Sequence, residues 1–242
     1  MKYFFWLLGL GLLFTLLERW KPRQKRPLLR NGIGIDLAHV VMNSFAFPFL
    51  ISQIVPYQFP SLKLEWAAGL SWWNQFLLMT LYCDLAQYGI HNLLHRVPWL
   101  WRFHKIHHQA PALDWMVNWH FHYAEVLVYR SLLYIPAGIF GFAGDVMFWH
   151  GVLGTAMGHF THSNLKWNPG RLRYVFNSPA MHLWHHARAP KNKNFGMVFS
   201  VWDWLFGTAH FPSHDPESLG VAGEDRAPQT WIQQLVAPFK AT

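Results

Sequence analysis

Five apolar runs, separated by shorter polar and basic segments, dominate the first two thirds of the chain. They cover residues 3–17, 33–55, 66–90, 123–143 and 145–162. A helix needs about 20 mostly apolar residues to cross the hydrocarbon core of a bilayer, and most of these runs approach or exceed that length. The pattern therefore predicts an all-α integral membrane protein with about four to five transmembrane helices.

Composition supports this membrane assignment. The chain has 242 residues, of which 52% are hydrophobic and only 13% are charged, whereas soluble proteins average about 25% charged residues. Its 15 tryptophans and 20 phenylalanines fit a protein with residues at lipid–water interfaces. The net charge of +8 arises from basic blocks between the apolar runs, which does not favour a nucleic-acid partner. We expect one membrane domain spanning 1–242.

The distribution of Lys and Arg predicts which loops face the cytoplasm. The first run is followed by ERWKPRQKR, which favours an uncleaved anchor with its N-terminus outside; the alternative is a helix lying in the interface. Threading from that start puts 18–32, 91–122 and everything after about 163 in the cytoplasm. Those segments contain 17 of the 20 Lys and Arg residues, as the positive-inside rule requires.

Nine histidines fall into four short boxes, and all four lie on this cytoplasmic side. The boxes are HNLLH at 91–95, HKIHH at 104–108, a single histidine at 162, and HLWHH at 182–186. Residues three or four apart share a helix face, so each longer box aims its imidazoles at one point. Two copies of His-x-x-His-His are improbable by chance in a chain of this length, and structural histidines have no need to repeat a spacing. The pattern indicates metal ligands in a cytoplasmic, histidine-rich helical cap.

The number of histidines indicates two metal ions. Imidazole is a ligand for iron, copper, nickel and zinc, and a zinc ion usually takes four ligands. Nine or more histidines exceed the needs of one ion and suit two. A cysteine-based site is excluded because Cys83 is the only cysteine. His159, three residues before His162, is either a tenth ligand or a histidine that faces a polar neighbour.

Asp84, His122 and Glu125 are candidates for catalytic or supporting roles. Asp84 lies about two turns before His91, where a carboxylate can orient a ligand ring by accepting its second N–H; the alternative is a local cap or pair. His122 and Glu125 share a helix face at the start of the fourth apolar run. We interpret Glu125 as an acceptor for a ligand ring or as a direct ligand. The alternative is an acidic residue favoured there by the helix dipole.

Two long segments resemble the fatty acid hydroxylase/sterol desaturase superfamily. The first is DLAQYGIHNLLHRVPWLWRFHKIHH, which begins at Asp84. The second is FTHSNLKWNPGRLRYVFNSPAMHLWHH, followed by NFGMVFSVWDWLFGT. The resemblance covers roughly residues 80–210 as the catalytic region. It implies a membrane di-iron oxygenase whose ligands are His91, His95, His104, His107, His108, His162, His182, His185 and His186.

The same resemblance implies the cofactors and the reaction. Two iron ions, which zinc can replace on overexpression, would use O2 as co-substrate to hydroxylate a fatty-acyl, sterol or related lipid from the bilayer. A lipid desaturase and an ether-lipid monooxygenase are the alternatives within the superfamily. Departures such as Asn92, Asn192 and Phe195 put the substrate in doubt but remove no expected ligand. The non-enzyme alternative is a membrane metal carrier, which the clustering of the histidines on one face disfavours.

Electrons must come from a separate donor. The chain contains no haem-binding His-Pro-Gly-Gly segment, no Gly-x-Gly-x-x-Gly nucleotide fingerprint and no cysteine set for an iron–sulfur cluster. We expect either a redox protein that docks on the basic loops or a reduced pterin. The C-terminal residues 239–242, FKAT, bear no retention signal, which favours a bacterial inner membrane over the endoplasmic reticulum.

Overall fold

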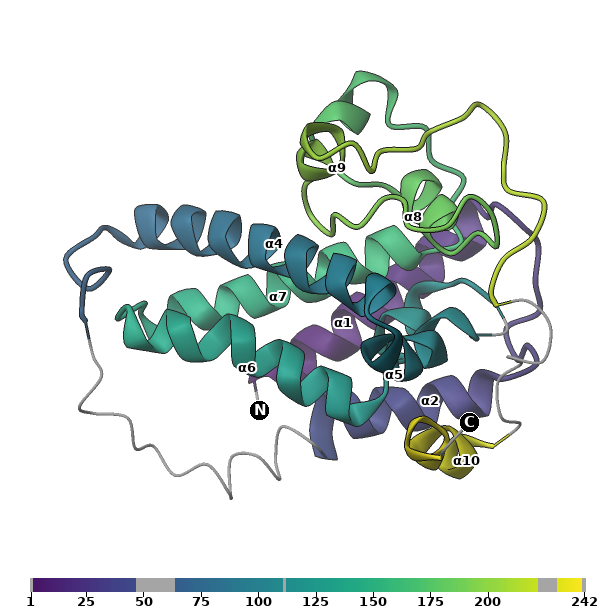
Figure 1. Ribbon diagram of the computed structural model, residues 1–242, viewed down its shortest axis with the longest axis horizontal. Coiled ribbons are helices and arrows are strands. Elements are labelled where there is room, and N and C mark those ends of the chain that lie inside the picture. The colour runs from purple at the N-terminus through teal and green to yellow at the C-terminus, as the bar shows by residue number, and fades with distance from the viewer. Residues whose placement is uncertain (1, 47–63, 111, 222–229, 241–242) are drawn as a thin grey trace.

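The regular structure of the chain is helical, as Figure 1 shows. The computed structural model describes residues 2–46, 64–110, 112–221 and 230–240. Over these residues the only strand-like pairings are isolated bridges, such as the one between Phe176 and Phe199. The predicted all-α class is therefore confirmed.

The longer helices follow the predicted apolar runs. They are α1 (Lys2–Trp20), α2 (Ile33–Val41) with its π-helical continuation η1 (Met42–Ala46), α4 (Trp72–Arg96), α6 (Tyr123–Ile139) and α7 (Gly144–His162). The second run was predicted to extend to residue 55, and its end lies outside the described residues. In Figure 1, α4, α6 and α7 run alongside one another, with α1 crossing behind them.

Shorter helices complete the molecule at the histidine-bearing end of the bundle and beyond it. They are α5 (Pro98–His108), η3 (Trp115–Trp119), η4 (Gly170–Tyr174), α8 (Pro179–His185), α9 (Val201–Leu205), α10 (Trp231–Val236) and η6 (Ala237–Phe239). Helix α10 lies in the last described stretch of the chain, residues 230–240. Its N-terminus is fixed by a capping box in which Thr230 and Gln233 satisfy each other's backbone N–H groups.

Helix α7 lies at the centre, where it packs against α1, α4, α8 and η3. One buried apolar cluster joins the bundle helices through Met79 and Cys83 of α4, Leu133 and Ala137 of α6, and Val146 of α7. These side chains are at most 4% exposed. This core fixes the bundle below the histidine boxes, so the boxes at the helix ends are presented on a rigid support.

Local sequence sets where the histidine-bearing helices end. Helix α4 stops at Arg96 because Val97 precedes a proline, which disfavours helical backbone; Val97 is extended, with φ −91° and ψ 114°. Pro98 then occupies the first turn of α5, a position where its missing N–H costs nothing. The chain therefore reverses between HNLLH and HKIHH, and the two boxes face each other.

Within the described residues, one helix meets the length and composition expected of a membrane span. This helix is Tyr3–Trp20 in α1, with a mean hydropathy of 1.2 over 18 residues. Helices α4 and α6 also expose large apolar side chains, including Trp73, Leu77, Leu127 and Leu132. Exposed large apolar side chains on two neighbouring helices fit a surface that contacts lipid or protein.

Candidate metal centre

The structure gathers the nine boxed histidines into two groups. The first, which we call the five-histidine group, consists of His91, His95, His104, His108 and His185. The second, the four-histidine group, consists of His107, His162, His182 and His186. Within each group all potential ligand nitrogens lie within 4.8 Å of one another. All of these side chains are buried except that of His95, which is half-buried.

In both groups the rings approach each other through their Nε2 atoms. The Nε2–Nε2 distances in the five-histidine group are 3.1 Å for His91–His104, His95–His108 and His108–His185. In the four-histidine group they are 3.1 Å for His107–His162, 2.9 Å for His162–His182 and 3.3 Å for His182–His186. Ligands bound to one metal at about 2.1 Å are separated by about 3.0–3.4 Å in octahedral to tetrahedral geometry. The observed distances match those of one ion per group.

The tautomers of several rings leave these Nε2 atoms without protons. His91, His162 and His185 each place Nδ1 2.8–3.0 Å from a backbone carbonyl, of Phe195, Gly158 and Lys193 respectively. A carbonyl only accepts, so Nδ1 must donate, and the Nε2 of a neutral ring is then a bare lone pair. Lone pairs that face one another repel unless a cation lies between them. The arrangement therefore fits metal ions.

The protonation states also suit metal binding. Burial, followed by the charge of neighbouring histidines, lowers the pKa of His104, His107 and His108 well below the ordinary histidine value. The same causes lower the pKa of His186. These rings are therefore neutral near pH 7, and neutral imidazole is the form that binds a metal.

Glu125 contacts the five-histidine group through His104. Its Oε1 lies 2.7 Å from His104 Nδ1, so the carboxylate accepts the ring N–H and leaves Nε2 free to face the group. The other carboxylate oxygen, Oε2, is buried without a hydrogen-bond partner among the described residues. Of the two site roles considered for Glu125, this geometry matches that of an acceptor that orients a ligand ring.

Asp203 supports the same group from residues 163–212, the segment after α7 that we call the cap, and sequence reasoning missed it. Its carboxylate accepts hydrogen bonds from the backbone N–H groups of Phe195 and Gly196 at 2.7 and 2.9 Å, and from the Thr208 hydroxyl at 2.7 Å. The loop held in this way supplies the carbonyls that orient His91 and His185. The available signal was the acidic residue inside NFGMVFSVWDWLFGT, a segment that resembles the family.

Asp84 holds the cap to the bundle through backbone groups of the cap. Its carboxylate accepts hydrogen bonds from the backbone N–H of Val198 at 2.8 Å and of Phe199 at 3.0 Å, and from Trp202 Nε1 at 2.9 Å. These partners differ from the second N–H of a ligand ring, which was the role expected for Asp84. They also differ from a local cap or pair, because they lie more than a hundred positions away in the sequence.

Tyr88, one helical turn after Asp84, faces the cap in the same way. Its hydroxyl lies 2.9 Å from Thr208 Oγ1, and its ring stacks on Phe206 with centroids 5.3 Å apart. This face of α4 is therefore occupied by the cap, which explains why the Asp84 carboxylate binds the cap segment.

His122 and His159 lie outside both histidine groups. His122 is the N-cap of α6: its Nδ1 accepts from the Ala124 backbone N–H at 3.1 Å, and its Nε2 donates to the Leu235 carbonyl at 2.9 Å. His159 Nδ1 lies 3.0 Å from Asn118 Nδ2. Of the two roles considered for His159, the geometry matches a histidine that faces a polar neighbour.

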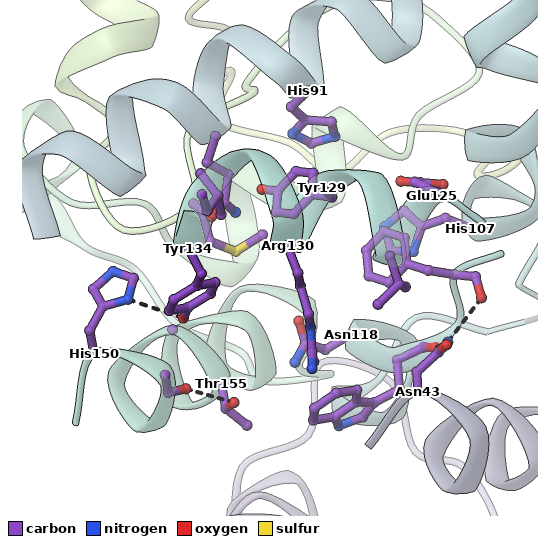
Figure 2. Close-up of a pocket in the computed structure, with 18 of the residues that line it drawn as sticks. Asn43, His91, His107, Asn118, Glu125, Tyr129, Arg130, Tyr134, His150 and Thr155 are labelled. Atoms are coloured by element: carbon purple, nitrogen blue, oxygen red, sulfur yellow. Dashed lines mark hydrogen bonds between the residues drawn. The ribbon is translucent and has the colours of Figure 1, made fainter. Parts of the chain in front are cut away.

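A cavity of about 380 Å³ adjoins the two groups. Five of the nine histidines line it, together with Glu125 and Tyr129 from α6. Figure 2 shows Glu125 and Tyr129 among the histidines at one side of this cavity. The rest of the cavity lining includes apolar side chains such as Leu133, Met147 and Phe148. The cavity can therefore hold a largely apolar molecule against the histidines.

The fold and this site define a class of helical proteins with a candidate dinuclear, histidine-only metal centre. The chain belongs to the fatty acid hydroxylase family, whose model matches residues 76–208, more than half of its length. This confirms the resemblance that the histidine boxes indicated.

Named relatives support the same family. Ornithine lipid hydroxylase from Rhizobium tropici is 29% identical over 94% of this chain and 72% of its own length. Alkylglycerol monooxygenase from Danio rerio is 29% identical over 75% of this chain, and cholesterol 25-hydroxylase from Mus musculus is 32% identical over 62%. The chain spans only 40% and 51% of these last two proteins. No solved structure matches the chain significantly. Because the relatives are hydroxylases and monooxygenases, the prediction of an oxidoreductase is confirmed.

Proposed function

We propose that the protein is an O2-dependent di-iron lipid hydroxylase that uses electrons from an external donor. The observation that supports this most directly is the pair of histidine groups whose Nε2 atoms converge beside a largely apolar cavity. The balanced reaction converts a C–H bond, O2, two electrons and two protons into a C–OH bond and water. An aliphatic C–H bond is beyond acid–base side chains, so a redox metal is required.

The nine grouped histidines would hold the two iron ions. Bound iron would supply the activation of O2. The protein's own contribution is to fix the rings: the carbonyls of Phe195, Lys193 and Gly158 accept their Nδ1–H groups, and Glu125 does the same for His104. The cavity lining would hold the lipid beside the histidines and orient the reacting carbon.

We further propose that the bundle is one membrane domain with four to five spans and a cytoplasmic cap. Helix α1 has the composition of a span, and the outward faces of α4 and α6 expose large apolar side chains. All nine histidines lie near the cytoplasmic ends of α4 and α7 or beyond them in this topology. The relative that covers 94% of the chain is bacterial, which supports a bacterial inner membrane.

The electron donor is proposed to be a separate redox protein or a reduced pterin. The cap and the segment after α1 contain most of the chain's Lys and Arg residues, which would attract an acidic redox protein. Such docking weakens with rising ionic strength. Turnover that falls with salt when a protein donor is supplied, but not when reduced pterin is supplied, would support the protein donor.

An ether-lipid monooxygenase is a second candidate, favoured by the alkylglycerol monooxygenases among the relatives. Hydroxylation of the carbon beside an ether oxygen gives a hemiacetal, which breaks into an aldehyde and an alcohol. A desaturase would instead remove two hydrogen atoms. The product therefore distinguishes all three reactions.

The test is to express the wild type and His185→Ala in an aerobic host and to compare total lipid mass spectra. The matched control is His214→Ala, which removes an exposed histidine that belongs to neither group. We expect one lipid class to gain the mass of one oxygen atom with the wild type and the control only. The same lipid profile from all three strains, with iron bound and a donor supplied, would contradict the proposal.

A further inference from the structure

Arg130 is a cation in the cavity wall that has no anionic partner among the described residues. It lies on α6, is half-buried, and lines the cavity. Over the described residues its guanidinium makes a cation–π contact, 5.8 Å from the centroid of the Trp119 ring, with no ion pair or hydrogen bond. The acidic residue in the cavity lining, Glu125, already accepts a hydrogen bond from His104. The guanidinium donors therefore remain available to a ligand.

Arg130 is in the middle of an apolar helix, where a charge is costly. Charged residues within membrane helices usually face a cavity or a partner and mark a functional site. Arginine presents a planar set of donors that matches the oxygens of a carboxylate or a phosphate. Since this chain supplies no such oxygens to Arg130 in the described region, a bound molecule is the natural source.

Asn43 adds an acceptor to the same part of the cavity. Its side chain is 1% exposed and donates from Nδ2 to the carbonyls of Trp119 and Phe121 at 2.8 and 2.9 Å. Its Oδ1 is buried and has no hydrogen-bond partner among the described residues. Trp119 thus connects the two side chains, because Arg130 covers its ring and Asn43 binds its carbonyl. Together they offer one set of donors and one acceptor to a polar headgroup.

The guanidinium of Arg130 lies across the cavity from His91, one of the histidines of the candidate metal centre (Figure 2). Figure 2 shows Arg130 extending away from His91 toward Asn118. Arg130 and Glu125 both line the cavity from α6 and are separated by about 7.5 Å along the helix axis. Side chains on a helix tilt toward its N-terminus, which explains how Arg130 reaches Trp119, just before α6 begins. The guanidinium therefore lies on the side of the cavity away from His91.

We propose that Arg130 binds an oxyanion of the lipid substrate, a carboxylate or a phosphate, and so determines which lipids are accepted. This rests on the proposed lipid hydroxylase function. With the oxyanion held at Arg130, the apolar lining, which includes Leu133, Met147 and Phe148, would take the hydrocarbon part of the lipid.

The test measures equilibrium binding to the purified, metal-loaded protein in a neutral detergent. Three probes are compared. Tritiated palmitate carries a carboxylate, tritiated methyl palmitate is its uncharged ester, and dilauroyl phosphatidic acid carries a phosphate. The variants are Arg130→Gln and Arg130→Lys. We expect the wild type to bind at least one anion about tenfold to a hundredfold more tightly than methyl palmitate. Arg130→Gln should abolish this preference and leave methyl palmitate binding unchanged, while Arg130→Lys retains part of it.

The outcomes separate this proposal from the proposed function. A preference for palmitate identifies a carboxylate, and a preference for phosphatidic acid identifies a phosphate. Equal binding of all three probes by the wild type would overturn the proposal, as would equal losses for anion and ester in Arg130→Gln. If Arg130→Gln fails to fold, the proposal requires that Arg130→Lys still prefer the anion. The binding measurement does not require turnover. A preparation that binds an anionic probe more tightly than methyl palmitate but hydroxylates no lipid would therefore count against the hydroxylase function and not against the role of Arg130.

Discussion

The two histidine groups are built from the same residue type but are supported differently. In the five-histidine group, the Nδ1 atoms of three rings meet acceptors: the carbonyls of Phe195 and Lys193, and Glu125. In the four-histidine group, His162 has such an acceptor, whereas the Nδ1 atoms of His107 and His182 are buried without partners among the described residues. The rings of the first group are oriented by hydrogen bonds that they donate to acceptors in the cap and in α6, and the second group depends more on packing.

Ring packing replaces hydrogen bonds at His107. Its ring stacks on Phe121 with centroids 4.1 Å apart and planes within 10°. Stacking holds the plane of a ring but selects neither its tautomer nor its basicity. The two groups should therefore respond differently to substitutions, and the differences can be measured as metal content.

The largest effect is expected from removing a ligand. His182→Ala leaves three histidines in the four-histidine group, and His185→Ala leaves four in the other. Both should reduce turnover by more than about a hundredfold, beyond the loss typical of a residue that only orients a ligand. We expect His182→Ala to lose about one metal equivalent and His185→Ala to lose less, because four ligands can still complete a site. Elemental analysis of purified protein measures this. Greater metal loss in His185→Ala than in His182→Ala would contradict the expected difference between the two groups.

A smaller effect is expected from Asp203→Asn. The substitution weakens the hold on the loop whose carbonyls orient His91 and His185. Metal affinity of the five-histidine group should fall about tenfold to a hundredfold, while the four-histidine group retains its metal. Chelator competition should then show one weakened site of two.

The control for this experiment is Asp145→Asn. Asp145 lies at the other end of the bundle, where its carboxylate accepts a hydrogen bond from Trp72 Nε1. It should leave both affinities unchanged. Equal weakening of both groups in Asp203→Asn would show that the cap supports them together.

The parts of this site that depend on spacing could be predicted from the sequence. The boxes placed nine histidines on helix faces, and the structure brings all nine into two groups. Helix class and the positions of the long helices followed from the apolar runs. What spacing could not assign was the division into groups: His107 and His108 are neighbours in sequence, yet they belong to different groups.

The supporting residues were harder to predict because their partners are distant in sequence. Asp84 lies near His91 along α4, yet it binds backbone groups of Val198 and Phe199 across more than a hundred positions. His159 has the spacing of a ligand, but its position on α7 turns it toward Asn118. Such choices depend on how helices pack, and a periodic pattern does not specify packing.

Glu125→Gln tests whether the five-histidine group needs charge or only an acceptor. Glutamine retains a carbonyl oxygen that can accept the His104 Nδ1–H, whereas Glu125→Ala removes it. We expect several-fold weaker metal binding in Glu125→Gln and a loss of about tenfold to a hundredfold in Glu125→Ala. The same chelator competition measures both. Equal losses in the two variants would show that the negative charge is what matters.

The smallest effect on metal is expected from His159→Phe. Phenylalanine keeps a ring against Phe14 and Trp115 but removes the acceptor for Asn118 Nδ2. Metal content should remain at the wild-type value because His159 lies outside both groups. The lost hydrogen bond should lower the free energy of unfolding by about 1 kcal/mol, visible as a lower midpoint in thermal unfolding. Loss of a metal equivalent would instead make His159 a tenth ligand, and the four-histidine group would then be larger than the described geometry shows.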